Sequence, residues 1–175
     1  MFPRYLVLLF GLALAGCVTS KAPLLSNDSR VLPFLPGTAF EVYEREKPAD
    51  AWKKNEKPTR FTADSSLVVR ELDDAGKPKD DTYTFHPLGP QRFLVQARFK
   101  DGASYAYGVL EVRNGEGIAT GLNCKAIDRA AFRRSGRTVK DDYCDLGSAP
   151  DPLALLRRIA ANPAGPQVRY VPVVK

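Results

Sequence analysis

The side chains best suited to chemistry are scarce in this chain, because its 175 residues include three cysteines and one histidine. A single histidine argues against multi-histidine metal sites and against acid–base relays built from several imidazoles. His86 stands directly before Pro87, and proline restrains the preceding residue to an extended backbone, so a structural place at the end of a strand explains it. No serine lies in a nucleophile-elbow pattern. We therefore expect no catalytic residue, no metal ligand and no cofactor.

Paired carboxylates are the other candidates for acid–base or calcium chemistry. Three such pairs occur, at residues 73–74, 80–81 and 141–142. Neighbouring residues of a strand point to opposite faces, and all three pairs stand beside turn signals, where solvated aspartate is common. The sequence contains no phosphate-loop, dinucleotide or calcium-loop motif. These features give no specific reason to assign an enzyme.

The first seventeen residues carry the most specific motif. Arg4 precedes an apolar run at residues 5–16, which is too short to cross a membrane core as a helix, since that takes roughly 20 residues. The run ends in Leu14-Ala15-Gly16-Cys17, which resembles the lipobox of bacterial lipoproteins. The resemblance implies that residues 1–16 are a signal peptide and that Cys17 becomes the lipidated N-terminus. An ordinary secretory signal with an incidental cysteine, or a buried N-terminal helix, is the alternative.

The same resemblance predicts where the protein resides. The three acyl chains of the family would hold it in a membrane through lipid alone. In the enterobacterial sorting pattern, a second mature residue other than aspartate, here Val18, implies the outer membrane. We therefore expect a lipid-anchored protein of the bacterial envelope, at the periplasmic face of the outer membrane, with no nucleic-acid partner.

Two cysteines remain once Cys17 is lipidated. Export places Cys124 and Cys144 in an oxidising compartment, where two thiols are expected to pair. Closing a loop of about 20 residues stabilises a fold by roughly 3 kcal/mol in the chain-entropy account. The close CxxC spacing of redox-active pairs is absent. We predict a structural disulfide between these two residues.

Residues 125–140, which lie between these cysteines, are strongly basic, with six cations against Asp128 alone. The cations are Lys125, Arg129, Arg133, Arg134, Arg137 and Lys140. The segment's net charge of +5 equals the side-chain balance that remains when Arg4 leaves with the signal peptide, so the basicity is local. It is a candidate site for an anionic envelope component or the acidic face of another envelope protein. A solvated loop without a ligand is the alternative.

Composition predicts one globular domain, because 44% of the residues are hydrophobic and 26% are charged. We place this domain at residues 37–175. Residues 17–36 contain several prolines and are interpreted as the lipidated cysteine and a flexible tether. The leucines of this segment and Phe34 leave open the alternative that it packs on the domain.

Alternating apolar and polar residues predict a series of strands. In residues 92–100 one face carries Phe93, Val95, Ala97 and Phe99. Similar segments cover residues 38–46, 66–72, 82–88 and 104–113, and glycine turn signals follow at 101–102 and 114–115. The pattern predicts a mainly β fold, with an antiparallel meander forming a small barrel or sandwich and a C-terminal α-helix.

The C-terminal helix has clear start and stop signals. Asp151 is a good N-cap, Pro152 suits the first helical position, and Asn162-Pro163 ends the helix. A weaker helical turn is predicted at residues 128–135. Residues 168–174 predict a last strand, and Pro172 favours a place at the sheet edge.

Three classes of function remain. We favour a non-enzymatic binding or scaffolding module. A small periplasmic inhibitor or ligand-binding barrel is the second hypothesis, and a hydrolase with unrecognised carboxylate or serine chemistry is the third. A deep apolar cavity would favour a carrier, a polar cleft near His86 an enzyme, and a filled core with an exposed aromatic or basic patch a scaffold.

Overall fold

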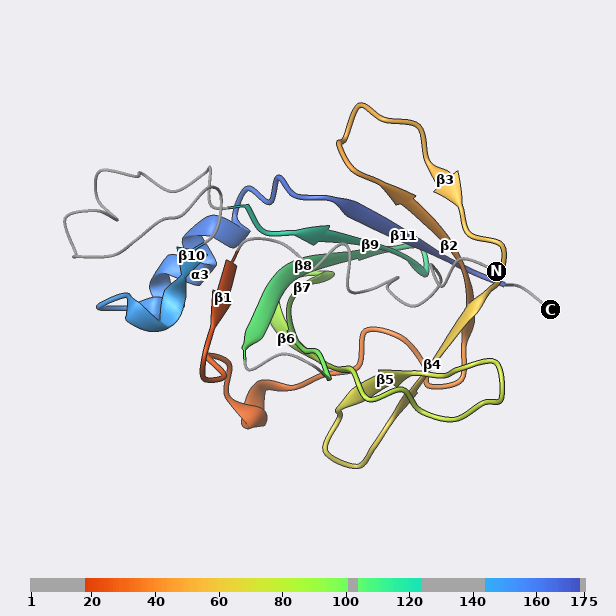
Figure 1. The fold of residues 1–175 in the computed structure, drawn as a ribbon, viewed down its shortest axis with the longest axis horizontal. Helices are drawn as coiled ribbons and strands as arrows, with labels where there is room; N and C mark the ends of the chain where they lie inside the picture. The colour runs from red at the N-terminus through yellow and green to blue at the C-terminus, as the bar shows by residue number, and fades with distance from the viewer. Residues whose placement is uncertain (1–17, 101–103, 124–143, 174–175) are drawn as a thin grey trace, which may run out of the picture.

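The computed structural model describes residues 18–100, 104–123 and 144–173. Eight strands form a closed antiparallel barrel, in which strands that follow one another in the chain are neighbours and the last strand pairs with the first (Figure 1). The barrel strands are β2 (Ala39–Arg45), β4 (Thr59–Ala63), β5 (Val69–Glu71), β6 (Thr82–Gly89), β7 (Arg92–Arg98), β8 (Tyr105–Arg113), β9 (Glu116–Gly121) and β11 (Gln167–Pro172). The predicted β-rich meander is therefore confirmed, and it takes the barrel form.

The turn between β8 and β9 shows how local sequence shapes this meander. Asn114 and Gly115 connect the two strands with φ angles of 53° and 81°. Asparagine and glycine tolerate this left-handed region, and a two-residue turn of this kind matches the twist of the strands that it joins. The hairpin signal at residues 114–115 is thus confirmed.

Side chains fill the interior of the barrel. The inward face of β7 carries Val95 and Ala97, as its alternation predicts, and the largest buried interior side chains are Phe40, Tyr83 and Tyr170. Phe34 also packs inside, since a Cβ atom added to Gly117 would lie only 2.6 Å from its ring. An eight-stranded barrel is just wide enough for side chains to fill it. Most of the interior is therefore a hydrophobic core.

A second layer covers the outer face of β7 and β8. It consists of β1 (Val18–Ser20), β10 (Cys144–Asp145), the 3-10 helix η3 (Leu146–Ser148) and α3 (Pro152–Ala160). The predicted C-terminal helix is α3, and the side chain of Asp151 caps it by accepting a 2.9 Å hydrogen bond from the amide of Ala154. Within the described ranges, no helix combines the length and the apolar character needed to cross a membrane.

Residues 18–36 pack on the barrel. The second interpretation of this segment, in which its leucines and Phe34 contact the domain, therefore describes it better than a flexible tether does. β1 pairs with β8, and Val18 and Leu25 are buried. The 3-10 helix η1 (Asn27–Ser29) follows, and Phe34 reaches the barrel core. Full burial of one such apolar side chain contributes about 1.5–3 kcal/mol, which offsets the entropy lost when the segment is ordered.

The same segment closes a seam in the barrel wall. β5 and β6 form a residue pair only between Val69 and Tyr83. Further along β6, Phe85 instead forms a bridge with Val31, whose amide donates a 2.9 Å hydrogen bond to the Phe85 carbonyl. We call this gap between β5 and β6, occupied by residues 30–36, the seam.

β11 corrects the expectation of an edge strand. It lies between β2 and β9 and closes the barrel. Pro172 pairs with Phe40 at the last position of β11, whereas the pairing of β11 with β9 has already ended at Tyr170. Proline thus occupies the end of the strand, where one neighbour remains and a missing amide hydrogen is tolerated.

Candidate functional site

A face of partly exposed aromatic and charged side chains covers the outside of the barrel at β2. The hairpin of β2 and β3 (Lys53–Lys54) extends beyond the ring (Figure 1). Along β2, Phe40 and Val42 point into the core, so the alternate residues point outward. We call the resulting surface the cation–aromatic face; its residues are Glu41, Tyr43, Arg45, Trp52, Lys54, Glu116 and Arg169.

Tyr43 stands at the centre of this face, between two cations. The Lys54 Nζ atom lies 5.7 Å from the centre of the Tyr43 ring, and the Arg169 guanidinium carbon lies 6.0 Å from it. The Tyr43 hydroxyl donates a 2.8 Å hydrogen bond to Glu41, whose other carboxylate oxygen accepts one of 2.5 Å from Lys54. Glu116 accepts two hydrogen bonds from Arg169, at 2.7 and 3.1 Å. The ring and both cations are thereby held in place.

Arg45 and Trp52 form a second cation–aromatic pair beside the first. The guanidinium carbon of Arg45 lies 4.2 Å from the centre of the Trp52 ring. Its Nε atom donates a 2.7 Å hydrogen bond to Gln167, and Nη1 donates one of 2.6 Å to the Pro48 carbonyl. Both acceptors are neutral, so the described part of the chain shows no carboxylate paired with Arg45.

Electrostatics keeps the groups around Tyr43 in fixed protonation states near neutral pH. The hydrogen bond from Lys54 lowers the pKa of the Glu41 carboxyl, and the hydrogen bond from Tyr43 lowers it further. The same two bonds act in reverse on the partners, because Glu41 raises the pKa of Tyr43 and the pKa of Lys54. The face therefore presents a neutral phenol and charged cations.

The composition of this face suits recognition of another protein. Tryptophan, tyrosine and arginine are enriched among the residues that dominate binding energies at interfaces. Exposed ion pairs such as Lys54–Glu41 contribute little to stability, so the fold alone does not require this arrangement. The three cations outnumber the two carboxylates, which favours an acidic partner.

His86 lies in a different place, on the outer face of β6 beneath the N-terminal segment. It is 3% exposed. Nδ1 is 2.8 Å from the Ser29 hydroxyl and Nε2 is 2.9 Å from the Thr84 hydroxyl. Burial lowers the pKa of His86 to about 4, and nearby Arg30 lowers it too. An imidazole with this pKa is a weak base at neutral pH, and hydroxyls rather than a carboxylate orient it. This geometry anchors η1 to β6.

Glu71 is a buried carboxylate, and buried acids often serve in catalysis. Glu71 is 7% exposed, and it accepts a 2.7 Å hydrogen bond from the Lys79 ammonium and one of 3.3 Å from the Thr59 hydroxyl. The lysine neutralises it. The pair joins β5 to the loop that precedes β6 and explains how a carboxylate is tolerated there.

Two of the predicted aspartate pairs act in turns and surface ion pairs. Asp73 accepts hydrogen bonds from the amides of Ala75 and Lys77, which fixes a turn. Asp74 pairs with Lys57, and Asp80 pairs with Lys100. Residues 141–142 lie outside the described residues. In the described ranges, no three histidine, cysteine or acidic side chains gather as metal ligands would.

Several predicted site residues lie outside the described residues. They are Cys17, Cys124 and all six cations of the basic segment. Cys144 is described: it is fully buried in β10, where it pairs with Val18. The lipid anchor, the disulfide and anion binding by the basic segment therefore stay predictions.

The cation–aromatic face itself was missed at the sequence level, although a signal for it was present. In residues 38–46, Tyr43 falls on the polar side of an alternating strand, between Glu41 and Arg45. An aromatic residue on a solvent-facing side indicates a surface contact more than a core position. Arg169 joins it through the pairing of β11 with β2, and Trp52 joins it through the β2–β3 hairpin.

Comparison with known proteins adds no relative. No protein-family model, no curated protein and no solved structure matches this chain. The geometry of the barrel and of its surface is therefore the basis on which its function is proposed.

Proposed function

We propose that this chain is a lipid-anchored protein of the bacterial envelope whose barrel is a non-enzymatic binding module for an acidic surface of another envelope protein. The observation that carries the proposal is the contrast between a barrel interior that side chains largely fill and a partly exposed cation–aromatic face whose groups are held by hydrogen bonds. Among the features that separate the three hypotheses, this combination favours a scaffold over a carrier.

Attachment through Cys17 would place the barrel directly at the membrane. Val18 is fully buried and follows Cys17 immediately, so the two Cα atoms are about 3.8 Å apart. A lipid on Cys17 would thus join the barrel without a spacer. Replacing Cys17 with Ser should move the protein out of the membrane fraction or leave it as an unprocessed precursor. Unchanged mass and fractionation would reject the anchor.

The binding role is tested by crosslinking in intact cells with the full-length lipidated protein. A photoreactive amino acid placed at Trp52 should give one discrete adduct with a protein partner. Lys54→Glu should abolish this adduct, because it replaces a cation on the face with an acid. Lys53→Glu is the matched control, since it makes the same charge change at the neighbouring position of β3, which points to the other side of the strand.

The adducts formed by these two variants decide whether the face binds the partner. Loss of the adduct in Lys54→Glu with retention in Lys53→Glu supports the face as the binding surface. Equal adducts in both variants, or no adduct from Trp52 in the unmodified background, would reject it.

A further inference from the structure

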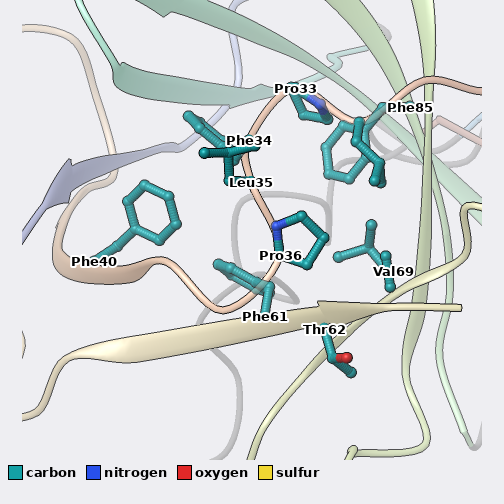
Figure 2. A pocket seen from close by; sticks show the side chains of 11 residues that line it. Pro33, Phe34, Leu35, Pro36, Phe40, Phe61, Thr62, Val69 and Phe85 are labelled. Atoms are coloured by element: carbon teal, nitrogen blue, oxygen red, sulfur yellow. The ribbon is translucent and has the colours of Figure 1, made fainter.

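An apolar pocket lies at the seam, on the side of the barrel away from α3 (Figures 1 and 2). Residues 32–36 form one wall, and the β4–β5 hairpin forms the opposite wall. Four aromatic rings surround it, from Phe34, Phe40, Phe61 and Phe85. The cavity has a volume of about 30 Å³, and its lining is almost entirely carbon, so water would find few hydrogen-bond partners in it.

The rim of this pocket exposes apolar surface to solvent. Leu35 is 82% exposed although its neighbours Phe34 and Pro36 line the same pocket. An exposed leucine continuous with a dry cavity forms one apolar surface. A ligand with a hydrocarbon chain would bury both at once.

A cation stands at the edge of the seam. Arg30 donates a 3.0 Å hydrogen bond from Nη1 to the Ser66 carbonyl and one of 2.6 Å from Nη2 to the Asn27 side chain. Both acceptors are neutral, and the described residues show no carboxylate paired with it. Ser66 belongs to the loop between Ala63 and Val69, which both line the pocket. A guanidinium without a paired carboxylate among the described residues is therefore held against the loop that borders the apolar cavity.

The wall formed by the β4–β5 hairpin is weakly attached. It pairs with β6 through one residue pair and with β2 through two. By contrast, β7 pairs with each neighbour along its whole length. Separating the hairpin from residues 32–36 breaks few backbone hydrogen bonds, so the pocket can widen to admit a chain larger than its resting volume.

From this geometry we propose that the seam binds a free fatty acid, with the carboxylate against Arg30 and the chain in the pocket and along Leu35. Arg30 supplies the charge complementary to the head, and the phenylalanine-lined cavity supplies the surface for the chain. The site is separate from the cation–aromatic face, so it goes beyond the proposed protein-binding role, and either can fail alone.

Photolabelling of the full-length protein in its membrane tests the proposal. A fatty acid carrying a diazirine on its chain should label residues 31–36 or 59–71. Excess dodecanoate should remove most of this label. Dodecanol, which lacks the anionic head, should compete at least about tenfold less well, because it makes no ion pair with Arg30.

Variants test separately the pocket that holds the hydrocarbon chain and the arginine that pairs with the carboxylate. Ala63→Phe fills the pocket and should reduce labelling about tenfold. Ala49→Phe makes the same change at an exposed position of the β2–β3 hairpin, outside the pocket lining, and should leave labelling unchanged. Leu35→Ser removes apolar rim at an exposed position, so it should lower labelling without affecting folding. Arg30→Gln should abolish the preference for dodecanoate over dodecanol.

The result that overturns the proposal is equally specific. Label spread evenly along the polypeptide, as expected for contact with the bilayer alone, would reject a site at the seam. Labelling that survives in both folded Ala63→Phe and Leu35→Ser would reject it as well. Equal competition by dodecanoate and dodecanol in the unmodified protein would reject Arg30 as the partner of the head.

Discussion

The buried histidine makes the stability of the barrel depend on pH in a defined window. The pKa of His86 is lowered from an ordinary value of 6.5 to about 4 in the folded protein. The unfolded chain therefore binds more protons than the folded chain between pH 6.5 and 4, and the free energy of unfolding falls as the pH drops through this range. The full contribution is present above pH 6.5.

The size of the effect follows from the shift. Each unit of pKa difference corresponds to about 1.4 kcal/mol, so the loss amounts to about 2 kcal/mol at pH 5 and approaches roughly 3 kcal/mol below pH 4. No discount for solvent screening applies, because the side chain is 3% exposed. Desolvation is the main cause, since the hydroxyls of Ser29 and Thr84 can accept hydrogen bonds from a charged ring as well as from a neutral one.

Two measurements check this prediction. Urea unfolding of the mature protein across pH 4–7.5 should show a steeper loss of stability than the same series for His86→Gln, which cannot titrate. Because His86 is the only histidine in the chain, its ring resonances can be followed in the folded protein without assignment ambiguity. A titration midpoint near 6.5, or parallel stability curves for the two proteins, would refute the reasoning.

Three further predictions concern other parts of the chain. Unreduced mature protein should migrate faster in electrophoresis than reduced protein, and Cys124→Ser should remove the difference; two alkylatable thiols in unreduced protein would disprove the disulfide. Arg133→Glu with Arg134→Glu should weaken binding of the delipidated protein to anionic vesicles at low salt with little change in melting temperature, whereas equal binding would leave the solvated-loop interpretation. Gly165→Ala should destabilise the barrel by about 1–3 kcal/mol, because the added Cβ would lie 2.4 Å from a backbone carbonyl oxygen of β9. Thermal unfolding should show no such loss for Gly89→Ala, whose Cβ meets nothing within 4 Å.

Local patterns accounted for much of the barrel. Alternation in residues 92–100 predicted which side of β7 faces the core, and Asp151 with Pro152 predicted the start of α3. These features depend on residues two to four positions apart, so they can be identified without the rest of the fold. Strand β4 and strand β9 were not singled out, because their segments are short and contain polar or small residues at core positions.

The candidate binding surfaces were less accessible to sequence reasoning. The cysteines and the basic segment attracted attention by residue type, yet the described surface centres on Tyr43 and Arg169, which are 126 positions apart. The fatty-acid pocket likewise depends on residues before β2 meeting the β4–β5 hairpin. Such sites arise from contacts between distant segments, and an outward-facing Tyr43 does not by itself identify Arg169 as its neighbour.

The amino-acid sequence by itself determined the local elements: the alternating strands, the Asn114-Gly115 turn, the capped helix and the lipobox-like motif. Only the tertiary structure decided how these elements close. It placed β11 between β2 and β9 despite Pro172, and it used residues 18–36 to cover the outer face and fill the seam. The physical reason is that short-range preferences act between near neighbours, whereas barrel closure depends on pairing such as Gln167 with Arg45, which becomes favourable only when the intervening chain has already buried its apolar face.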